Sequence, residues 1–401
     1  MTIASFIPSV TGMEAMSHAQ ETVASNIANM NTTGYKQNET LFYSLLGSEG
    51  VNSGAQSGLN SSRVDITGVG YYDRTNIGIE GVVSATGNNF DVAINGNSNA
   101  FFTLDDGFGN IYYTRAGDFL RLTQNGVTYL VSSGGLFVQG FAATDDGFSN
   151  TLSDVTIDAP QTIPQKETTE ASIIANVPAN DVDRSVYSIR IYSENYDGAN
   201  LNMVLEKAEG KENTWNLSFE LEDGTAVGNS TEVIFNTDGT IKTPQNVTAA
   251  ITWNDGSTSS VDIDISAMTQ YGESSQVTKI DQNGFPSGNL ESLTIDEDGV
   301  LRAYYTNGSD VNIAKLALTG FTAPENLTPY NNTLFEANGE TGNSYYVDPD
   351  GILVPQSLES STVNLEEEFS QMIVLQRAYS LNAQSFTVNN EMLSVLVDLV
   401  S

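Results

Sequence analysis

The sequence predicts a mainly β protein with α-helical termini, in which two antiparallel β domains of sandwich or barrel type are nested by insertion between the ends. Three observations predict this fold class. Apolar residues recur about every 3.5 residues at both ends of the 401-residue chain, and between the ends they alternate with polar residues. Glycine is frequent, at 35 residues, and proline is rare, at 10, which is typical of turn-rich β proteins.

The N-terminal end predicts a helix over roughly residues 12–31. The segment Thr11–Glu14 fits a capping box, in which a Thr side chain bonds a first-turn amide and a Glu follows three residues later. Gly34 fits the left-handed residue that often follows a helix end. Spacings of three and four residues define an apolar seam with one polar position: Met13, Met16, Gln20, Val23, Ile27 and Met30.

The C-terminal end predicts a longer helix of about 35 residues, which is about 50 Å at 1.5 Å per residue. Asn364 is the expected cap, and Glu366–Glu368 lie in the first turn, where the helix dipole favours negative charge. Its seam alternates spacings of four and three: Leu365, Phe369, Met372, Gln376, Tyr379, Ala383, Phe386, Asn390, Leu393, Val397 and Val400.

Two seams at opposite ends of one chain predict that the terminal helices pair as an antiparallel coiled coil. Because the C-terminal helix is the longer, part of its seam is expected to stay unpaired in one molecule and to mark an interface. The alternative is that each helix packs on the protein's own β core.

Between the helices, residues 187–191, 201–205, 215–221 and 261–265 alternate apolar and polar side chains, which predicts antiparallel sheets with one solvated face. Four Asp-Gly pairs read as hairpin turns: Asp223-Gly224, Asp238-Gly239, Asp255-Gly256 and Asp298-Gly299. No strand–helix alternation occurs, which argues against a parallel α/β sheet.

Linker-like segments at 159–164 and 283–288 divide the chain, and much of the acid excess lies between them. The predicted domains are a terminal helical domain with its connecting segment, an inner β domain, and an inserted outer acidic β domain. Their bounds are 1–70 with 358–401, 71–145 with 285–357, and 146–284. Residues 47–62 carry no motif that predicts a role.

Charge and composition exclude several classes of function. The chain has 50 Asp and Glu against 15 Lys and Arg, a formal charge of −35, so it offers no basic groove for nucleic acid or anionic lipid. No apolar run reaches the length of a membrane span. Cysteine is absent and His18 is the sole histidine, which excludes thiolate chemistry and predicts no enzyme, no metal site and no cofactor.

The remaining short motifs predict neither a catalytic group nor a metal site. His18 reads as a packed or exposed helix residue rather than a general base. The segment Asp296–Gly299 begins like a calcium loop, but its twelfth position is Asn307 instead of Glu, so a hairpin turn is predicted. Asp348–Gly351 is likewise predicted to be a turn. The N-terminal residues lack the basic region of a Sec signal, which predicts a cytosolic protein or export by another route.

Several segments resemble the bacterial flagellar axial proteins of the rod and hook. The N-terminal signature is carried by Ala24–Asn29 and Thr32–Lys36. Further segments are similar to the C-terminal signature of that family and to its shared inner β domain: residues 358–365, 372–373, 376–379, 382–384, 392–393, 89–96, 101–102 and 113–119. Within the family, residues 293–300, 305–308 and 316–318 are similar to the hook subunits rather than to the shorter rod subunits.

This resemblance implies a structural subunit that self-assembles into the curved, tubular hook and transmits torque from rod to filament. It implies a homopolymer, with a distal rod protein, a hook cap protein, hook–filament junction proteins and the flagellar type III export apparatus as partners. The expected location is extracellular, in the flagellum. The alternatives are a distal rod protein or, from another class, a secreted β-rich hydrolase or carbohydrate-binding protein.

The resemblance also implies that residues of the two terminal helices make the polymerisation contacts, with polar members setting the register. We call this set the polymerisation seam: Met13, Met16, Val23, Asn26, Ile27, Asn29, Met30, Leu365, Phe369, Met372, Gln376, Tyr379, Phe386, Asn390, Leu393 and Val397.

Overall fold

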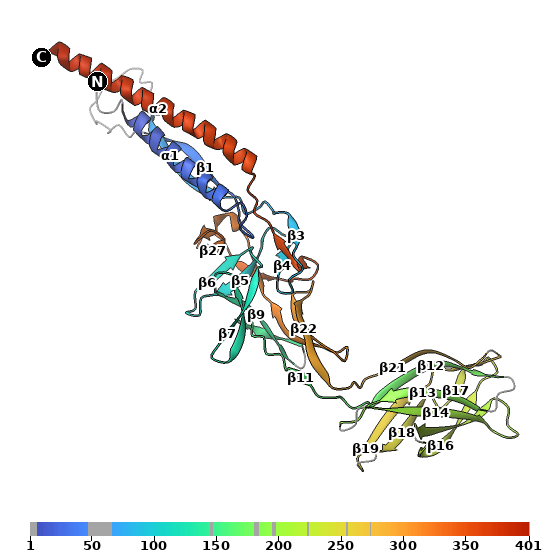
Figure 1. The fold of residues 1–401 in the computed structure, drawn as a ribbon. Coiled ribbons are helices and arrows are strands. Elements are labelled where there is room, and N and C mark those ends of the chain that lie inside the picture. The colour runs from blue at the N-terminus through green and yellow to red at the C-terminus, as the bar shows by residue number, and fades with distance from the viewer. Residues whose placement is uncertain are drawn as a thin grey trace, which may run out of the picture. The chain divides into compact units, whose positions relative to one another are not determined.

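The computed structural model divides the chain into two compact units (Figure 1). It describes residues 6–46, 66–144, 147–179, 184–194, 198–222, 224–253, 256–272 and 274–400, so the unassigned segment 47–62 lies outside the described residues. Unit 1 contains Met1–Asp158, Leu293–Arg302 and Asn312–Ser401, and unit 2 contains Ala159–Ser292 and Ala303–Val311. The predicted bounds of three domains are not tested by this division and stay a prediction.

Both predicted terminal helices are present, as α1 (Ile7–Ala28) and α2 (Leu365–Val400). The predicted capping box at Thr11 is wrong, because α1 begins five residues earlier than expected, with Pro8 in its first turn. Proline suits that position, since its missing N–H is one that a helix start leaves unpaired. Thr11 therefore lies inside the helix, and its hydroxyl donates to the carbonyl oxygen of Ile7 at 2.9 Å.

Gly34 is not the helix cap that the sequence predicted, because α1 ends at Ala28 with Asn29 as its C-cap. Gly34 does adopt the left-handed conformation, with φ of 66°, in the turn that follows. A Cβ atom there would lie 2.5 Å from the backbone nitrogen of Ala116, so only glycine permits this approach of two backbones.

The predicted start of α2 is confirmed. The Asn364 side-chain oxygen accepts a hydrogen bond from the backbone N–H of Glu366 at 3.1 Å, as an N-cap does. The helix runs for 36 residues, and Glu366–Glu368 occupy its first turn.

Antiparallel pairs make up most of unit 1. A hairpin of β1 (Asn38–Leu46) and β2 (Ile66–Thr75) follows α1. Two short pairs bring distant segments together: β3 (Val83–Ala85) with β30 (Ser357–Glu359), and β4 (Val92–Ile94) with β29 (Leu353–Pro355). The other elements are β5 (Ala100–Asp105), β6 (Ile111–Thr114), β7 (Phe119–Gln124), β8 (Val127–Ser132), β9 (Phe137–Thr144), β10 (Gly147–Asp154), β25 (Leu318–Phe321), the 3₁₀ helix η2 (Pro324–Asn326), β26 (Thr328–Pro329), β27 (Leu334–Glu336) and β28 (Ser344–Val347).

The core of unit 1 joins residues from both halves of the sequence. Phe102 and Phe119 meet edge to face at 5.1 Å between ring centroids, and Leu301 and Leu316 are buried in the same cluster. A second aromatic cluster packs Phe101 against Phe321 and Phe335. Neither half could bury these side chains alone, so the β part of unit 1 depends on both.

Strands β22 (Gly288–Ile295), β23 (Val300–Tyr305) and β24 (Asp310–Leu316) contain residues of both units. The turn predicted at Asp296–Gly299 joins β22 to β23, with Gly299 at φ of 73°. The turn predicted at Asp348–Gly351 lies between β28 and β29.

Unit 2 packs two five-stranded sheets around one core. The strands that the sequence predicted by alternation are present, and their apolar residues are buried except Leu221, which is half-buried. One sheet has the order β13 (Arg184–Ile191), β14 (Ala199–Lys207), β15 (Thr214–Leu221), β16 (Ala226–Phe235), β17 (Ile241–Thr243), and every pair is antiparallel. The other contains β12 (Glu170–Pro178), β18 (Asn246–Thr252), β19 (Thr258–Asp264), β20 (Thr269–Tyr271) and β21 (Gln276–Gln282), and β11 (Thr162–Ile163) pairs with β22.

One feature of unit 2 departs from the expected antiparallel pairing. Strand β12 pairs in parallel with β19 and then with β20. Only four residues separate β19 from β20, so the chain continues in one direction along the edge of β12. Alternation of apolar and polar residues reports which face is buried, but it carries no information on strand direction.

Burial in unit 2 can be tested on a single strand. We expect Ile189→Ala, at a fully buried position of β13, to lower the free energy of unfolding by about 2–5 kcal/mol. Val186→Ala, at a 47% exposed position of the same strand, should change it by less than about 0.5 kcal/mol. Both tryptophans of the chain, Trp215 and Trp253, lie in this core, so tryptophan fluorescence during urea unfolding reports unit 2. Equal effects of the two substitutions would contradict the assigned faces.

Candidate functional site

The two terminal helices lie side by side and antiparallel, as the sequence predicted (Figure 1). Near the start of α1, the rings of Phe6 and Phe386 meet at 5.3 Å, and the hydroxyl of Ser9 donates to Ser385 at 3.2 Å. At the other end of α1, the Asn26 amide donates to Glu368 at 2.9 Å. The pair therefore extends over the whole of α1, while α2 is 14 residues the longer.

Small side chains let the helices approach. Gly12, Ala15 and Ala19 are buried on α1. A Cβ atom at Gly12 would lie 2.9 Å from the side-chain nitrogen of Asn382, so a larger residue at this position would displace the Asn382 amide.

The β1–β2 hairpin covers another side of α1, and sequence reasoning missed it. The Asp73 carboxylate accepts from Thr40 at 2.7 Å and lies 2.8 Å from the ring nitrogen Nε2 of His18. The His18 ring stacks on Tyr71 at 4.4 Å. His18 therefore helps to attach the hairpin to α1. The run of aromatic and branched residues in 40–46 and 66–72 was the available signal for the two strands.

Asn26 connects α1, the start of the hairpin and α2. Its side-chain nitrogen donates to the Asn38 carbonyl oxygen at 2.8 Å and to Glu368. Its side-chain oxygen accepts from the Tyr35 hydroxyl and from the Asn38 backbone N–H, both at 3.0 Å. Asn26 is 1% exposed, so these four bonds satisfy its amide completely inside the protein.

Glu359 forms a buried ionic cluster with Lys36 and Arg115. The three side chains are at most 1% exposed. The Lys36 ammonium donates to Glu359 Oε1 at 2.6 Å, and Arg115 Nε donates to Oε2 at 2.9 Å. The Gly81 backbone N–H also donates to Oε1, at 2.8 Å. We call Lys36, Arg115 and Glu359 the ionic anchor.

The remaining donors of the ionic anchor bond to backbone carbonyl oxygens. Arg115 Nη1 donates to the carbonyl oxygens of Asn97 and Ala100, at 2.7 and 2.8 Å. Lys36 donates to the carbonyl oxygen of Ile79. Burial lowers the pKa of Lys36, and the adjacent Glu359 carboxylate opposes that change. The sequence carries no signal for this cluster, because the burial of two of its 15 bases is visible only in the structure.

Glu368 is a buried carboxylate on the first turn of α2. One oxygen accepts from Asn26 at 2.9 Å and from the Gln37 amide at 2.7 Å, whereas Oε2 has no hydrogen-bond partner. Burial raises the pKa of this carboxyl group. An unpaired buried carboxylate oxygen destabilises the ionised form.

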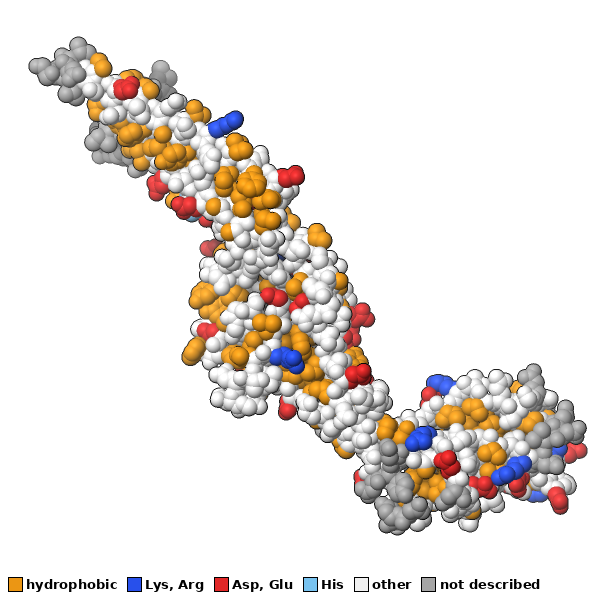
Figure 2. Space-filling view, in the orientation of Figure 1, with side chains coloured by type: hydrophobic (Ala, Val, Ile, Leu, Met, Phe, Trp, Pro, Cys, Tyr) orange, Lys and Arg blue, Asp and Glu red, His pale blue; other side chains and the backbone are white. Residues whose placement is uncertain are grey.

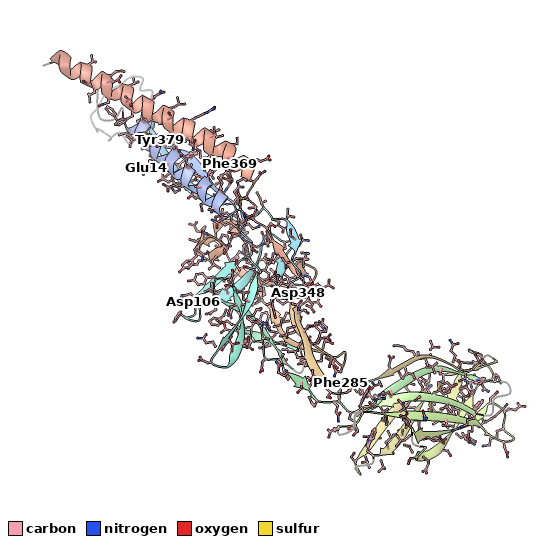
Figure 3. All side chains as sticks on the ribbon, viewed as in Figure 1. Glu14, Asp106, Phe285, Asp348, Phe369 and Tyr379 are labelled. Atoms are coloured by element: carbon pink, nitrogen blue, oxygen red, sulfur yellow. The ribbon has the colours of Figure 1, made fainter. Side chains whose placement is uncertain are left out.

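The structure distributes the polymerisation seam over three environments in the single chain, and no observation tests its role between subunits. Val23, Asn26 and Asn29 are buried. Half-buried members are Met13, Met16, Ile27, Leu365, Met372 and Leu393, and exposed members are Met30, Phe369, Gln376, Tyr379, Phe386 and Asn390. The side chain of Val397 lies outside the described residues. Figure 3 shows Phe369 and Tyr379 on α2 and Glu14 on α1.

The helix α2 exposes more apolar surface than the seam accounts for. Six further side chains on it are between 44% and 66% exposed: Ile373, Val374, Leu381, Val388, Met392 and Val395. Figure 2 shows hydrophobic side chains gathered over the helical part. Exposed apolar side chains gathered on one helix are typical of an interaction site.

The described part of the chain contains neither a cluster of metal-ligating side chains nor a membrane-spanning helix. Its His, Asp and Glu side chains form no cluster of three or more that could hold a metal ion. No helix within the described ranges is long and apolar enough to cross a bilayer.

Three family models match segments of the chain. "Flagella basal body rod protein" matches residues 9–36, which include α1 and Lys36. "Flagellar basal body rod FlgEFG protein C-terminal" matches residues 354–399, which include Glu359 and α2. "Flagellar basal body protein FlaE D2 domain" matches residues 160–285.

Curated relatives match along nearly their whole length. The chain is 30% identical over 425 residues to "Flagellar hook protein FlgE" of Rhizobium meliloti (strain 1021), covering 97% of each chain. It is 28% identical over 429 residues to the protein of that name from Salmonella typhimurium, covering 98% of this chain and all of the relative. A crystal structure of the Helicobacter pylori flagellar hook protein FlgE2 shares the fold, with a TM-score of 0.53, 13% identity and coverage of 69% of this chain and 99% of the other.

The ionic anchor makes a direct prediction about stability. We expect Glu359→Gln to lower the free energy of unfolding of unit 1 by about 3–5 kcal/mol, because it removes the carboxylate that Lys36 and Arg115 share and leaves Glu80, 3.9 Å from Arg115, to balance both charges. Far-UV circular dichroism in urea measures the loss, while the tryptophan transition of unit 2 should stay unchanged. Glu39→Gln, which breaks an exposed ion pair with Arg74, is the control and should cost at most about 1 kcal/mol. A similar small cost for Glu359→Gln would show that the cluster contributes little.

Glu368 predicts a pH dependence with a defined sign. Its raised pKa means that the folded state binds the proton more tightly than the unfolded chain does. Wild-type stability should therefore fall as pH rises from the ordinary Glu value, about 4.3, through the raised value, and then level off. Glu368→Gln removes this contribution, so its stability relative to wild type should increase over the same interval. Urea unfolding at several pH values, followed by circular dichroism, measures the difference; a difference independent of pH would contradict the assignment.

Proposed function

Because the chain belongs to the flagellar hook protein family, we propose that it is the structural subunit that self-assembles into the curved, tubular hook. The polymer acts as a flexible joint that transmits torque from the rod to the filament. The match to curated hook proteins along nearly their full length carries this proposal. The exposed apolar surface of α2 supports it, because proteins that function as monomers rarely expose apolar side chains gathered on one element.

We propose that the polymerisation seam lies at the contacts between subunits. Its exposed members, such as Phe369 and Tyr379, are accessible to a neighbouring copy in the single chain. Of its buried members, Asn26 bonds to Glu368 of α2 and holds the helix pair in register, whereas Asn29 bonds to Ser25, Thr32 and Asn332 and fixes the end of α1. Buried polar groups often contribute specificity of this kind rather than net stability.

We propose three domains for the assembled subunit: a helical polymerisation domain (1–70 and 358–401), an inner β domain (71–145 and 285–357) and an outer acidic β domain (146–284). Backbone hydrogen bonds of 2.9 and 3.1 Å between Lys166 and Phe285 support an inserted domain whose chain enters and leaves at one place. Polar, solvated β surfaces make individually weak contacts, which suits subunits that slide past one another during rotation.

The proposed partners are further copies of the chain, a distal rod protein, a hook cap protein, hook–filament junction proteins and the flagellar type III export apparatus. The proposed location is extracellular. The absence of cysteine is compatible with export of an unfolded chain, since no disulfide has to form on either side of the membrane. The role is structural and requires neither catalysis nor a cofactor.

Truncation tests the proposed function. Removal of residues 365–401 deletes α2, so we expect the protein to remain monomeric at concentrations where the full chain forms tubes, as seen by negative-stain electron microscopy. As the control, residues 167–284 are removed and Lys166 is joined to Phe285 through two glycines. This deletion should still polymerise, with altered curvature. Tubes formed without α2, or no tubes from the full chain, would contradict the proposal.

A further inference from the structure

The outward faces of the two helices carry complementary rows of residues. At 3.6 residues per turn, a position two residues away points to nearly the opposite side of a helix. On α1, Gly12, Ala19 and Asn26 form the buried face. The positions two residues before and after each of them are exposed and form the α1 outer stripe: Val10, Glu14, Ser17, Glu21, Ala24 and Ala28.

The same reasoning defines an outward row on α2. Glu368, Asn382 and Phe386 face α1, as their contacts with Asn26, Gly12 and Phe6 show. On the opposite side, six exposed residues form the α2 outer stripe: Ile373, Arg377, Leu381, Gln384, Val388 and Val395. Its four apolar members are between 51% and 66% exposed. In an isolated subunit this row has no cover among the described residues.

The two stripes complement each other in charge and size. The α1 outer stripe carries Glu14 and Glu21, and α1 contains no Lys or Arg. Arg377 is the sole base of α2 and lies within the α2 outer stripe. Half of the α1 outer stripe is small (Ser17, Ala24 and Ala28), whereas the apolar residues of the α2 outer stripe are large and branched, a difference in size that lets two helices interdigitate. In the described part of the chain, no ion pair is formed by Arg377, Glu14 or Glu21.

A hollow along α1 lies beside the acidic positions. It has a volume of ≈ 380 Å³ and is bordered by Glu14, Ser17 and Glu21 on α1 and by Tyr379 on α2. Figure 3 shows Glu14 and Tyr379 on neighbouring parts of the two helices. Glu14 and Glu21 are seven residues apart on one face, about 10 Å along the axis, so one guanidinium placed between them can bond either carboxylate.

We propose that the α2 outer stripe of one copy packs along the α1 outer stripe of a second copy, with Arg377 placed between Glu14 and Glu21. Within one copy the two stripes point away from each other, so only a second copy can bring them together. The contact joins two different surfaces, which makes it heterologous, and a heterologous contact repeats from copy to copy to build rings or helical polymers. This inference rests on the proposed function and names the surface through which it operates.

Charge reversal and its rescue test the inference on the full-length chain. We expect Arg377→Glu to raise the critical concentration for polymer formation at least tenfold, because it places three carboxylates together. The combination of Arg377→Glu with Glu14→Arg and Glu21→Arg reverses both sides and should restore the critical concentration to within threefold of wild type. Lys242→Glu, at an exposed position of unit 2, makes the same change in net charge and should leave the critical concentration unchanged. Sedimentation of polymer across a protein concentration series measures all four proteins.

The outcomes separate this inference from the proposed function. Wild-type protein that forms tubes, together with Arg377→Glu at an unchanged critical concentration, overturns the inference and leaves the proposed function standing. Failure of the triple variant to polymerise, with circular dichroism showing intact helices, also overturns the pairing of these stripes. If the wild-type chain forms no polymer, both fail. Mixing Arg377→Glu protein with Glu14→Arg/Glu21→Arg protein should produce copolymer at concentrations below the critical concentration of either protein alone, and no copolymer would contradict the heterologous contact.

Discussion

The buried carboxylate of Glu359 is the interaction on which unit 1 depends. It receives hydrogen bonds from Lys36, just after α1, and from Arg115, in the β part, and it lies itself just before α2. Three segments far apart in the sequence therefore meet at one charged point. Ions taken out of water are costly unless paired and hydrogen-bonded, and here the donors of both bases also bond to backbone carbonyl oxygens. The geometry is thereby restricted to one arrangement, which places both helices on the same side of the anchor.

The amide network of Asn26 extends this arrangement into the helix pair. Because Asn26 bonds to Tyr35, Asn38 and Glu368 together, a shift of α2 along α1 would leave several buried polar groups unpaired. The cover of α1 is completed by the β1–β2 hairpin. Within the described residues α2 has no such second cover, so it presents apolar residues on two opposite sides, one towards α1 and one outwards. A helix with two apolar sides is stable in water only as part of a larger assembly, which is the condition that a hook subunit meets.

The 3.5-residue period that defines the polymerisation seam predicts helices, but it does not decide which face of α2 packs against α1. The pattern correctly predicted two amphipathic helices that pair antiparallel. It placed Phe369, Gln376 and Asn390 on the paired side, whereas the structure leaves their side chains exposed and turns Glu368 and Asn382 towards α1. The residues of α2 are apolar around so much of the helix that a 3.5-residue period fits more than one face. The choice of face depends on Gly12 and Asn26, which belong to the other end of the chain.

The sequence by itself determined the elements: helical ends, a β interior whose buried strands alternate, and the Asn364 cap. These follow from interactions between residues a few positions apart, which the order of residues expresses directly. Only the tertiary structure decided the ionic anchor, the hairpin that covers α1, the direction of β12 against β19, and the face of α2 that meets α1. Each of these joins residues separated by tens to hundreds of positions, such as Lys36 and Glu359, and depends on which distant backbone comes near. Packing and the pairing of buried charge select that arrangement, and no local pattern records it.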